Sequence, residues 1–337
     1  MKVRLVVFLA TIAVLTGSNS ARIVGQMSGD TAQKHIDAAK AAAGQDWAWM
    51  YNTLCVDALG RVGTPAAPQA AAAATAPERT TWHAEPMKVF DNVYWLGQTE
   101  FSAWAITTSD GIILMDAIYD YSVRDEVVEG MKKLGLNPAS IKYAIMGHWH
   151  SDHSGGAKTL QELYGTKIIM GPADWDSVEK SNPTWKPKKD IVATDGMKVT
   201  LGDTTVTVYI TPGHTPGTVS VIIPLKDGKE RHVGAVWGGI NPNLYGHGVR
   251  NGPTLEAVIK MWTASAVRFM DIANKAGVDV YLTIHPGYDM ALEKIRALPY
   301  RKPGDPHPFV SKDELTRFLT IIKECDDAQL ARLESGS

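Results

Sequence analysis

The chain has 337 residues, of which 45% are hydrophobic and 21% are charged, the proportions of an ordinary globular protein with a sizeable core. Its formal net charge of -2 comes from interleaved acidic and basic residues. The sequence therefore lacks the concentrated positive charge of proteins that bind nucleic acid or an anionic membrane surface. We expect a small-molecule partner instead.

Residues 1–21 have the layout of a secretory signal peptide. Two basic residues precede an apolar run over 5–15, and small residues follow, with cleavage expected after Ser20 or Ala21. A membrane anchor is the alternative, but the run is too short to cross a bilayer comfortably and no stop-transfer charges follow it closely. No cysteine lies near the cleavage site, so a lipid anchor is not expected. The pattern predicts a periplasmic or secreted protein that leaves the membrane after processing.

Residues 22–80 are expected to form an N-terminal helical segment followed by a linker. The linker is the Ala/Pro-rich stretch "GTPAAPQAAAAATAPER", residues 63–79, which has no apolar period. Residues 81–337 are expected to form the main domain, which ends in a C-terminal helix.

The chain contains only two cysteines, Cys55 and Cys325, one in each terminal segment. In an oxidising compartment they are either two free thiols or one disulfide bridge. Export favours the bridge, because an even, minimal number of cysteines in an exported protein is typical of pairing.

Strand and helix patterns alternate along the main domain. Short apolar or alternating runs predict strands at 92–97, 102–108, 112–117, 141–147, 166–171 and 278–286, with antiparallel pairs within 197–214 and 218–239. Turns are predicted at 109–111, at the Gly-Asp pair 202–203 and at the Lys-Asp-Gly sequence 226–228. Amphipathic patterns predict helices at 123–135, 155–165, about 253–276 and about 311–333. Helices that flank sheets of mixed pairing indicate an α/β layered sandwich.

The stretch "IMGHWHSDHSGG" places three histidines and an aspartate within six positions, directly after the predicted strand 141–147. His148 and His150 are two residues apart where the chain leaves the strand, so both can reach one ion. Asp152 and His153 follow as the chain turns and can point towards a second ion. Incidental histidines of a polar loop would not be expected to cluster in this way.

Two further histidines stand at the ends of predicted strands. His214 lies in "YITPGHTPGT" and His285 in "YLTIHPGYD", where binding residues gather in α/β sheets. The remaining histidines lack this combination of strand end and Gly/Pro-rich loop: His35, His83, His232, His247 and His307.

The combination of imidazoles and one carboxylate, without a thiolate, suits zinc. A catalytic zinc ion keeps three protein ligands and leaves one position open for water. We therefore predict two zinc ions. The predicted ligand sets are His148, His150 and His214 for the first ion, and Asp152, His153 and His285 for the second.

These motifs, "HWHSDH", "GHTPGT" and "HPG", resemble the metallo-β-lactamase superfamily across most of the main domain, about residues 88–290. Asp116, in "IILMDA", falls where that superfamily places an acidic residue after an early strand, and we expect it to hold a ligand loop in place. The resemblance implies a four-layer αβ/βα sandwich with the zinc cleft at one edge of the two sheets.

One difference from the superfamily pattern indicates which of its subfamilies the sequence resembles most. Many hydrolases of the superfamily, such as glyoxalase II-like thioesterases and lactonases, carry an aspartate after the third histidine that bridges both metals. Here that region reads "HVGAVWGGINPN", with Trp237 and no acid, and it also lacks the zinc-binding cysteine of other β-lactamase subclasses. The pattern is most similar to the third subclass of class B β-lactamases, whose second zinc has an Asp-His-His set. A histidine at position 150, in place of glutamate, separates the chain from flavodiiron-type relatives.

The resemblance implies a zinc-dependent hydrolase that opens the amide of β-lactam antibiotics by a metal-activated hydroxide, which Asp152 would orient. The alternative on the same scaffold is a hydrolase of lactones, esters or other amides. A third possibility is a metal-binding or partner-binding protein whose N-terminal segment docks elsewhere. The oligomeric state is open at this stage.

Candidate substrate contacts are Trp149, Asn241 and Tyr245. Trp149 stands between two predicted ligands, where packing beneath the loop explains it equally well. Asn241 and Tyr245 belong to the polar, glycine-rich segment 240–252, which also contains His247 and Arg250. A plain surface loop explains that segment as well as a substrate-binding loop does.

Overall fold

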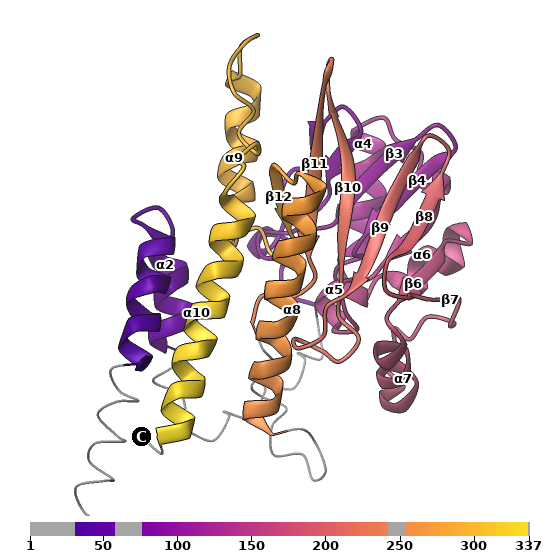
Figure 1. The fold of residues 1–337 in the computed structure, drawn as a ribbon. Helices are drawn as coiled ribbons and strands as arrows, with labels where there is room; N and C mark the ends of the chain where they lie inside the picture. Colours follow the sequence, from indigo (N-terminus) through magenta and orange to yellow (C-terminus); the bar gives the residue numbers. More distant parts are fainter. Residues whose placement is uncertain (1–30, 58–75, 242–253, 336–337) are drawn as a thin grey trace, which may run out of the picture.

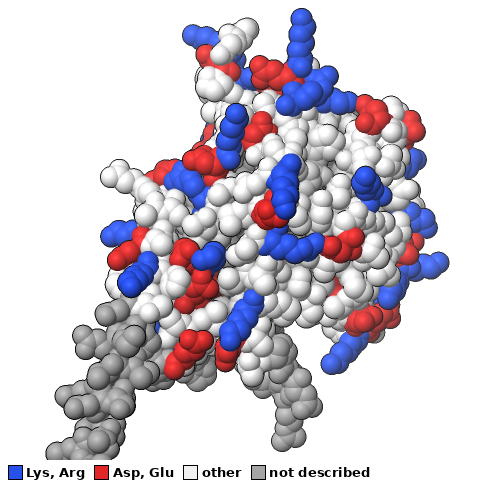
Figure 2. Space-filling model, in the orientation of Figure 1, with Lys and Arg blue, Asp and Glu red and all other residues white. Residues whose placement is uncertain are grey.

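The computed structural model describes residues 31–57, 76–241 and 254–335. The predicted signal peptide, most of the Ala/Pro-rich linker and most of segment 240–252, with Tyr245, lie outside the described residues. Within the described ranges, no helix is long and apolar enough to cross a membrane. Positive and negative side chains are interspersed over the face shown in Figure 2, as the net charge near zero suggests.

Two β-sheets form the centre of the structure (Figure 1). Among the described residues, the first sheet has seven strands in chain order: β1 (Met87–Phe90), β2 (Val93–Trp95), β3 (Trp104–Thr108), β4 (Gly111–Met115), β5 (Ile141–Ile145), β6 (Lys167–Met170) and β7 (Ile191–Val192). Its pairing is antiparallel from β1 to β4 and parallel from β4 to β7. This mixed pairing confirms the sequence prediction.

The second sheet is antiparallel except at one edge. In spatial order its strands are β12 (Val280–Thr283), β11 (Glu230–Trp237), β10 (Val219–Asp227), β9 (Thr204–Ile210) and β8 (Met197–Leu201). Only β11 and β12 pair in parallel within this described sheet. The β8–β9 hairpin turns at the predicted Gly-Asp pair, and the β10–β11 hairpin turns at Gly228 and Lys229, at the end of the predicted Lys-Asp-Gly sequence.

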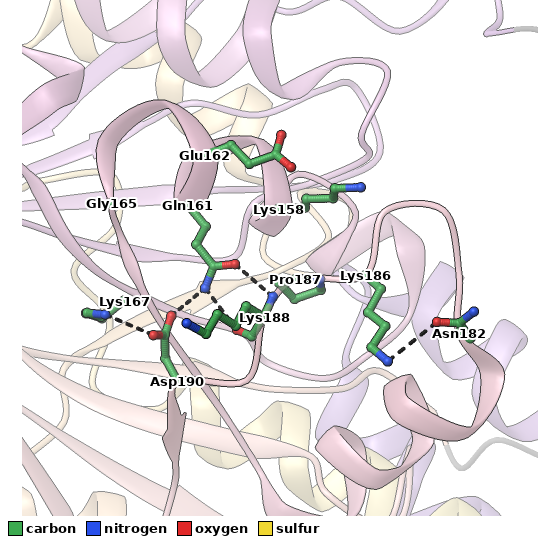
Figure 3. Close-up of a pocket in the computed structure, with 10 residues that line it drawn as sticks. All are labelled: Lys158, Gln161, Glu162, Gly165, Lys167, Asn182, Lys186, Pro187, Lys188 and Asp190. Carbon is green, nitrogen blue, oxygen red and sulfur yellow. Dashed lines mark hydrogen bonds and ion pairs between the residues drawn. The ribbon is translucent and has the colours of Figure 1, made fainter.

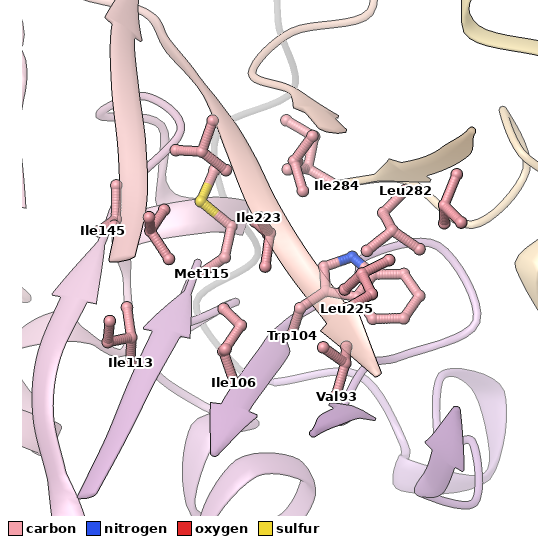
Figure 4. Close-up of a cluster of buried hydrophobic side chains, with 14 of the residues drawn as sticks. Val93, Trp104, Ile106, Ile113, Met115, Ile145, Ile223, Leu225, Leu282 and Ile284 are labelled. Carbon is pink, nitrogen blue, oxygen red and sulfur yellow. The ribbon is translucent and has the colours of Figure 1, made fainter. Parts of the chain in front are cut away.

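The inner faces of the two sheets pack against each other through buried aliphatic side chains (Figure 4). Ile106 and Ile113 of the first sheet meet Ile223 and Leu282 of the second, and all four are fully buried. In β9, burial alternates along the strand, as expected for a strand with one face on the core. Burying these side chains away from water is the main force that holds the sheets together.

Helices cover the outer face of each sheet. The first sheet is covered by the helical stretch Arg124–Glu129 with α4 (Gly130–Lys133), by α6 (Ala157–Tyr164) and by α7 (Pro172–Ser181). The second is covered by α8 (Leu255–Ala276) and α10 (Glu314–Ser335). The four layers form the αβ/βα sandwich that the family resemblance implied.

Several short elements were missed at the sequence level, namely β1, β7, α7 and α9 (Ala291–Ala297). Strand β7 has two residues and shows no periodicity. Helix α7 begins with Pro172 in its first turn and ends at Asn182, which has a left-handed conformation with φ 45°. Proline at the start and a left-handed residue at the end are typical helix boundaries, but the helix was missed because its sequence is only weakly amphipathic.

The described N-terminal segment packs on the chain's own C-terminal helices. Residues 31–43 are helical, and α2 (Ala48–Tyr51) follows. Trp47 is buried against Phe318 of α10, with ring centroids 6.1 Å apart. The Arg317 guanidinium donates to the carbonyls of Ala42 and Ala43, at the end of the first helix. This placement is contrary to the reading in which the N-terminal segment docks elsewhere.

A disulfide joins Cys55 to Cys325 of α10, which confirms the bridge that export favoured. Both cysteines are buried in the cluster that the N-terminal segment shares with α8 and α10. The bridge spans 270 positions of sequence. It therefore fixes the N-terminal segment to the far end of the chain.

We predict that the paired substitution Cys55→Ser with Cys325→Ser lowers the free energy of unfolding, because it restores freedom to a very long loop of the unfolded chain. The chain-entropy model gives about 5 kcal/mol, and measured values are often smaller. Urea unfolding of both proteins measures the difference. Reductant should destabilise the wild type and leave the double variant unchanged; an equal effect on both would contradict the prediction.

Candidate metal centre

The predicted ligands come together at one edge of the sandwich, where strands of both sheets end. Strand β5 runs into the loop with His148 and His150, and the short helix α5 (Ser151–Ser154) carries Asp152 and His153. His214 follows β9, and His285 follows β12. The structure thus brings together all six residues that the sequence singled out.

In the first cluster, three histidine nitrogens converge. Nε2 of His214 lies 3.1 Å from Nε2 of His148 and 3.2 Å from Nδ1 of His150. The opposite nitrogens of two of these rings point at backbone carbonyls. Nδ1 of His148 donates to Gly238 at 2.9 Å, and Nδ1 of His214 donates to Asn241 at 2.8 Å. In the neutral rings the protons are therefore on Nδ1, and the Nε2 lone pairs face each other.

Burial keeps these imidazoles neutral. It lowers the pKa of His150 to about 4 and that of His214 to about 3, and it lowers the pKa of His148 well below its ordinary value. Facing lone pairs without a proton between them repel each other, so a bound cation would stabilise the cluster. Three imidazole nitrogens are a set of donors that suits a divalent metal such as zinc. The residues present fit the predicted ion.

The second cluster is built around His153. Its Nδ1 donates to Oδ2 of Asp116 at 2.8 Å, and its Nε2 lies 3.1 Å from Oδ2 of Asp152 and 3.0 Å from Nε2 of His285. Nδ1 of His285 donates to the carbonyl of Glu100 at 3.0 Å. Asp116 also accepts the backbone N–H of the residue before His148, at 2.6 Å. The structure confirms that Asp116 holds the ligand loop in place.

The charges of the second cluster also favour a cation. Burial alone would lower the pKa of His153, but the carboxylates of Asp152 and Asp116 raise it to about 10. Burial alone would raise the pKa of Asp152, but the neighbouring His153 lowers it below its ordinary value. His148, Asp152 and His153 also bring ligand atoms within 4.8 Å of one another, so the two clusters adjoin. The donors of the second cluster therefore also suit a metal ion.

Asp174 of α7 joins the two loops of the first cluster through hydrogen bonds, although no sequence motif marks it. Its Oδ2 accepts the backbone N–H of Trp149 at 3.0 Å and the hydroxyl of Thr215 at 2.7 Å, and its Oδ1 accepts the N–H of Gly217 at 2.9 Å. Burial raises the pKa of Asp174 to about 7, although these hydrogen bonds oppose the rise. A single aspartate in "GPADWDSVE" follows no motif, so only the folded chain reveals it.

An indole occupies the position where relatives carry the bridging acid. Trp237, the last residue of β11, is buried against Trp262 and Phe269 of α8, with ring centroids 5.0 and 5.4 Å away. The next residue, Gly238, supplies the carbonyl that holds His148. A Cβ atom on Gly238 would overlap the carbonyl oxygen of Val219, so only glycine fits here.

The candidate substrate contacts are placed as follows. Trp149 is half-buried, packs against the cluster on the outer face of the first sheet, and has its ring 5.4 Å from that of His150. Asn241 holds His214 through its backbone carbonyl. Tyr245 lies outside the described residues. Substrate contact by these residues remains a prediction.

A pocket of about 680 Å³ between α6 and the loop 182–190 contains none of the candidate ligands (Figure 3). Several lysines line it, and its polar groups pair among themselves. Lys167 binds Asp190 at 3.0 Å, and the Gln161 amide bonds to the same carboxylate and to the Lys188 carbonyl. We therefore assign it no ligand.

Two further groups of histidine and carboxylate lie away from the centre: His35 with Glu324 and Asp327, and His232 with Asp227 and Glu230. In the first group Lys323 binds both carboxylates, at 2.7 and 2.9 Å. In the second, Arg301 binds both oxygens of Asp227. Since cationic side chains already occupy these carboxylates, neither group is a good metal site.

A family model described as the metallo-beta-lactamase superfamily matches residues 101–227, which contain the "HWHSDH" and "GHTPGT" motifs. The match covers less than half of this chain, and the fold and the ligand motifs around it are similar to those of the metallo-beta-lactamase superfamily. Among solved structures it is similar to BJP-1, a subclass B3 metallo-beta-lactamase of Bradyrhizobium japonicum, with 29% identity and a TM-score of 0.66 over 77% of this chain and 98% of that one. FEZ-1 from Legionella gormanii shares the fold, with 23% identity and a TM-score of 0.60 over 69% of this chain and 90% of that one.

Curated sequence relatives in the superfamily have other activities. An N-acyl homoserine lactonase from Bacillus sp is 32% identical over 103 residues, which are 29% of this chain and 39% of that enzyme. A hydroxyacylglutathione hydrolase from Maricaulis maris is 35% identical over 78 residues, 23% of this chain and 27% of that enzyme. These matches span well under half of either relative. They show similarity to hydrolases over part of the chain, and they do not select a substrate.

We predict that Asp174→Asn weakens metal binding by the first cluster. The amide keeps the shape of the side chain but turns an NH₂ group towards a donor, so the two ligand loops lose one of their shared acceptors. Residues that support metal ligands typically contribute 10- to 100-fold in metal affinity or activity. Competition with a chromophoric chelator measures the affinity for zinc. Asp176→Asn, on an exposed side chain of the same helix, is the matched control and should bind zinc like the wild type.

Proposed function

We propose that this protein is a hydrolase that uses two zinc ions to open the amide of β-lactams. The observation that carries the proposal is the second cluster: Nε2 of His153 lies 3.1 Å from Oδ2 of Asp152 and 3.0 Å from Nε2 of His285, while Trp237 occupies the position of the bridging acid. That set is the one implied by the resemblance to the third β-lactamase subclass. The similarity to the subclass B3 enzyme BJP-1 over nearly all of its length supports the same assignment.

The chain's own residues orient the site. When bound, the zinc ions would activate a water molecule and polarise the substrate carbonyl. The carbonyls of Gly238, Asn241 and Glu100 fix the tautomers of three histidines, so that Nε2 points inward. Oδ2 of Asp152 faces His153, which leaves Oδ1 to accept a hydrogen bond from the attacking water.

The second candidate function is the hydrolysis of lactones or esters at the same centre. The curated lactonase and thioesterase relatives favour it, because both activities belong to this superfamily. The same site geometry serves either carbonyl, so substrate turnover has to decide between them.

We also propose that the protein works outside the cytoplasm. The signal-peptide pattern of residues 1–21 and the buried disulfide between Cys55 and Cys325 support this placement independently.

We predict that His285→Ala lowers the zinc content from two ions towards one per chain, because two protein ligands are too few for a stable second site. His214→Ala should empty the first site instead.

Asp152→Asn should reduce turnover by a hundredfold or more, roughly 2.7 kcal/mol of barrier, and should affect turnover more than zinc content. Elemental analysis beside turnover separates these effects. Trp237→Phe is the control and should keep both ions; two zinc ions in His285→Ala would overturn the ligand assignment.

We predict that the zinc-loaded protein hydrolyses members of a panel of penicillins, cephalosporins and carbapenems. The same assay includes acyl homoserine lactones and thioesters, followed by absorbance or by pH-stat titration. Turnover of lactones with none for any β-lactam would replace the leading proposal by the second. Loss of all activity on chelation and its return with zinc is the expected control.

A further inference from the structure

A separate pocket of about 260 Å³ adjoins the metal centre. We call it the Gln98 pocket; it is lined by Pro77, Thr81, Trp82, Gln98, Thr99, Glu100, Phe101 and Tyr121. Two of its lining residues also contact the second ligand cluster. The carbonyl of Glu100 accepts from His285, and the ring of Phe101 lies 5.1 Å from the ring of His285. The pocket therefore lies against the outer side of the second ligand cluster.

Gln98 is fully buried, yet its amide forms no hydrogen bond. Neither its nitrogen nor its oxygen has a partner among the described residues. The amide lies near the Tyr121 hydroxyl and opposes the rise in the Tyr121 pKa that burial causes, but the two groups do not reach the geometry of a normal hydrogen bond. Buried polar groups are normally paired, so an amide left open towards a pocket suggests a missing partner.

The backbone holds this amide in place. The N–H of Gln98 donates to the carbonyl of Phe101 at 2.7 Å, and Gln98 forms an antiparallel bridge with His83. The neighbouring Thr99 N–H donates to the carbonyl of Trp82 at 3.0 Å. These contacts tie the turn on both sides, so the side chain is presented from a fixed backbone.

Aromatic rings form the pocket walls. The rings of Trp82 and Tyr121 meet edge to face, with centroids 5.5 Å apart. Tyr121 stacks on Tyr119 at 4.9 Å, and Tyr119 meets Phe101 at 5.1 Å, so a row of rings leads from the pocket to the ligands. The Trp82 indole N–H is already used, since it donates to Pro77 at 3.1 Å. The Gln98 amide is therefore the buried polar group left to recognise a ligand.

We propose that the Gln98 pocket is a subsite for the acylamino arm of the substrate. A carboxamide offers one donor and one acceptor, which is the complement of the Gln98 amide, and the planar arm packs against the walls formed by Trp82 and Tyr121. The identification of the arm rests on the proposed function, because acylated β-lactams and acyl homoserine lactones both carry a carboxamide beside the ring that is opened. The pocket thus selects for the arm and not for the ring.

A binding experiment tests the subsite without any turnover. Phenylacetamide is titrated calorimetrically into the zinc-loaded full-length protein and into Gln98→Leu, which keeps the volume but removes the donor and the acceptor. We expect at least tenfold weaker binding by the variant. Gln161→Leu, in the unrelated pocket of Figure 3, is the matched control and should bind like the wild type. Equal binding by Gln98→Leu and the wild type, or no binding by either, would overturn the subsite.

Two further variants test the pocket independently, in case Gln98→Leu does not fold. Tyr121→Leu removes an aromatic wall at a half-buried position and should also weaken phenylacetamide binding, while Tyr121→Phe should retain it. Thermal unfolding of each variant shows which of them are folded. Wild-type affinity in folded Tyr121→Leu would count against the proposed walls.

Kinetics then connect the pocket to the reaction. Gln98→Leu should raise KM at least tenfold for benzylpenicillin and for N-butanoyl homoserine lactone, whichever the wild type hydrolyses. It should leave kcat/KM unchanged for the matching substrates without an acyl arm, 6-aminopenicillanic acid and γ-butyrolactone. An equal loss for both kinds of substrate would contradict the subsite. If the wild type hydrolyses none of these compounds, the proposed function fails, while the phenylacetamide titration still decides the subsite.

Discussion

The metal centre depends on fixing the outer nitrogen of buried imidazole rings. The backbone carbonyls of Gly238, Asn241 and Glu100 and the carboxylate of Asp116 each accept one Nδ1 proton, which turns the opposite nitrogen inward. These four acceptors come from chain segments of both sheets. They can surround one point only if the two sheets end at the same edge, and the buried aliphatic core between the sheets sets that alignment. Packing far from the site thus determines the protonation pattern within it.

Residue type and spacing were enough to predict much of this arrangement. The histidines and aspartate of "HWHSDH" announce a metal site because their density has no ordinary structural explanation, and His214 and His285 follow recognisable strands. Short apolar runs and alternating apolar and polar residues made most of the strands predictable. The residues that were missed act through tertiary contacts. Asp174 is a single aspartate whose three donors come from two distant loops, and Gln98 differs from any surface glutamine only because the fold buries it.

The N-terminal segment becomes part of the site's surroundings, although it precedes the sandwich in the chain. Trp49, on α2, meets Tyr288 edge to face at 5.2 Å, and the ring of Tyr288 lies 6.2 Å from the ring of His285. An aromatic contact thus links α2 to the second ligand cluster. The similarity to BJP-1 covers 98% of that protein but 77% of this chain.

The Cys55–Cys325 bridge makes most of this protein a covalent ring. Every residue between the two cysteines belongs to the ring, which includes the Ala/Pro-rich stretch and all twelve strands of the described sheets. A protease that cuts the ring once leaves a single molecule of unchanged size on a non-reducing gel, and the two pieces separate only after reduction. In an oxidising compartment, therefore, one cleavage between the cysteines cannot release the N-terminal helices from α10.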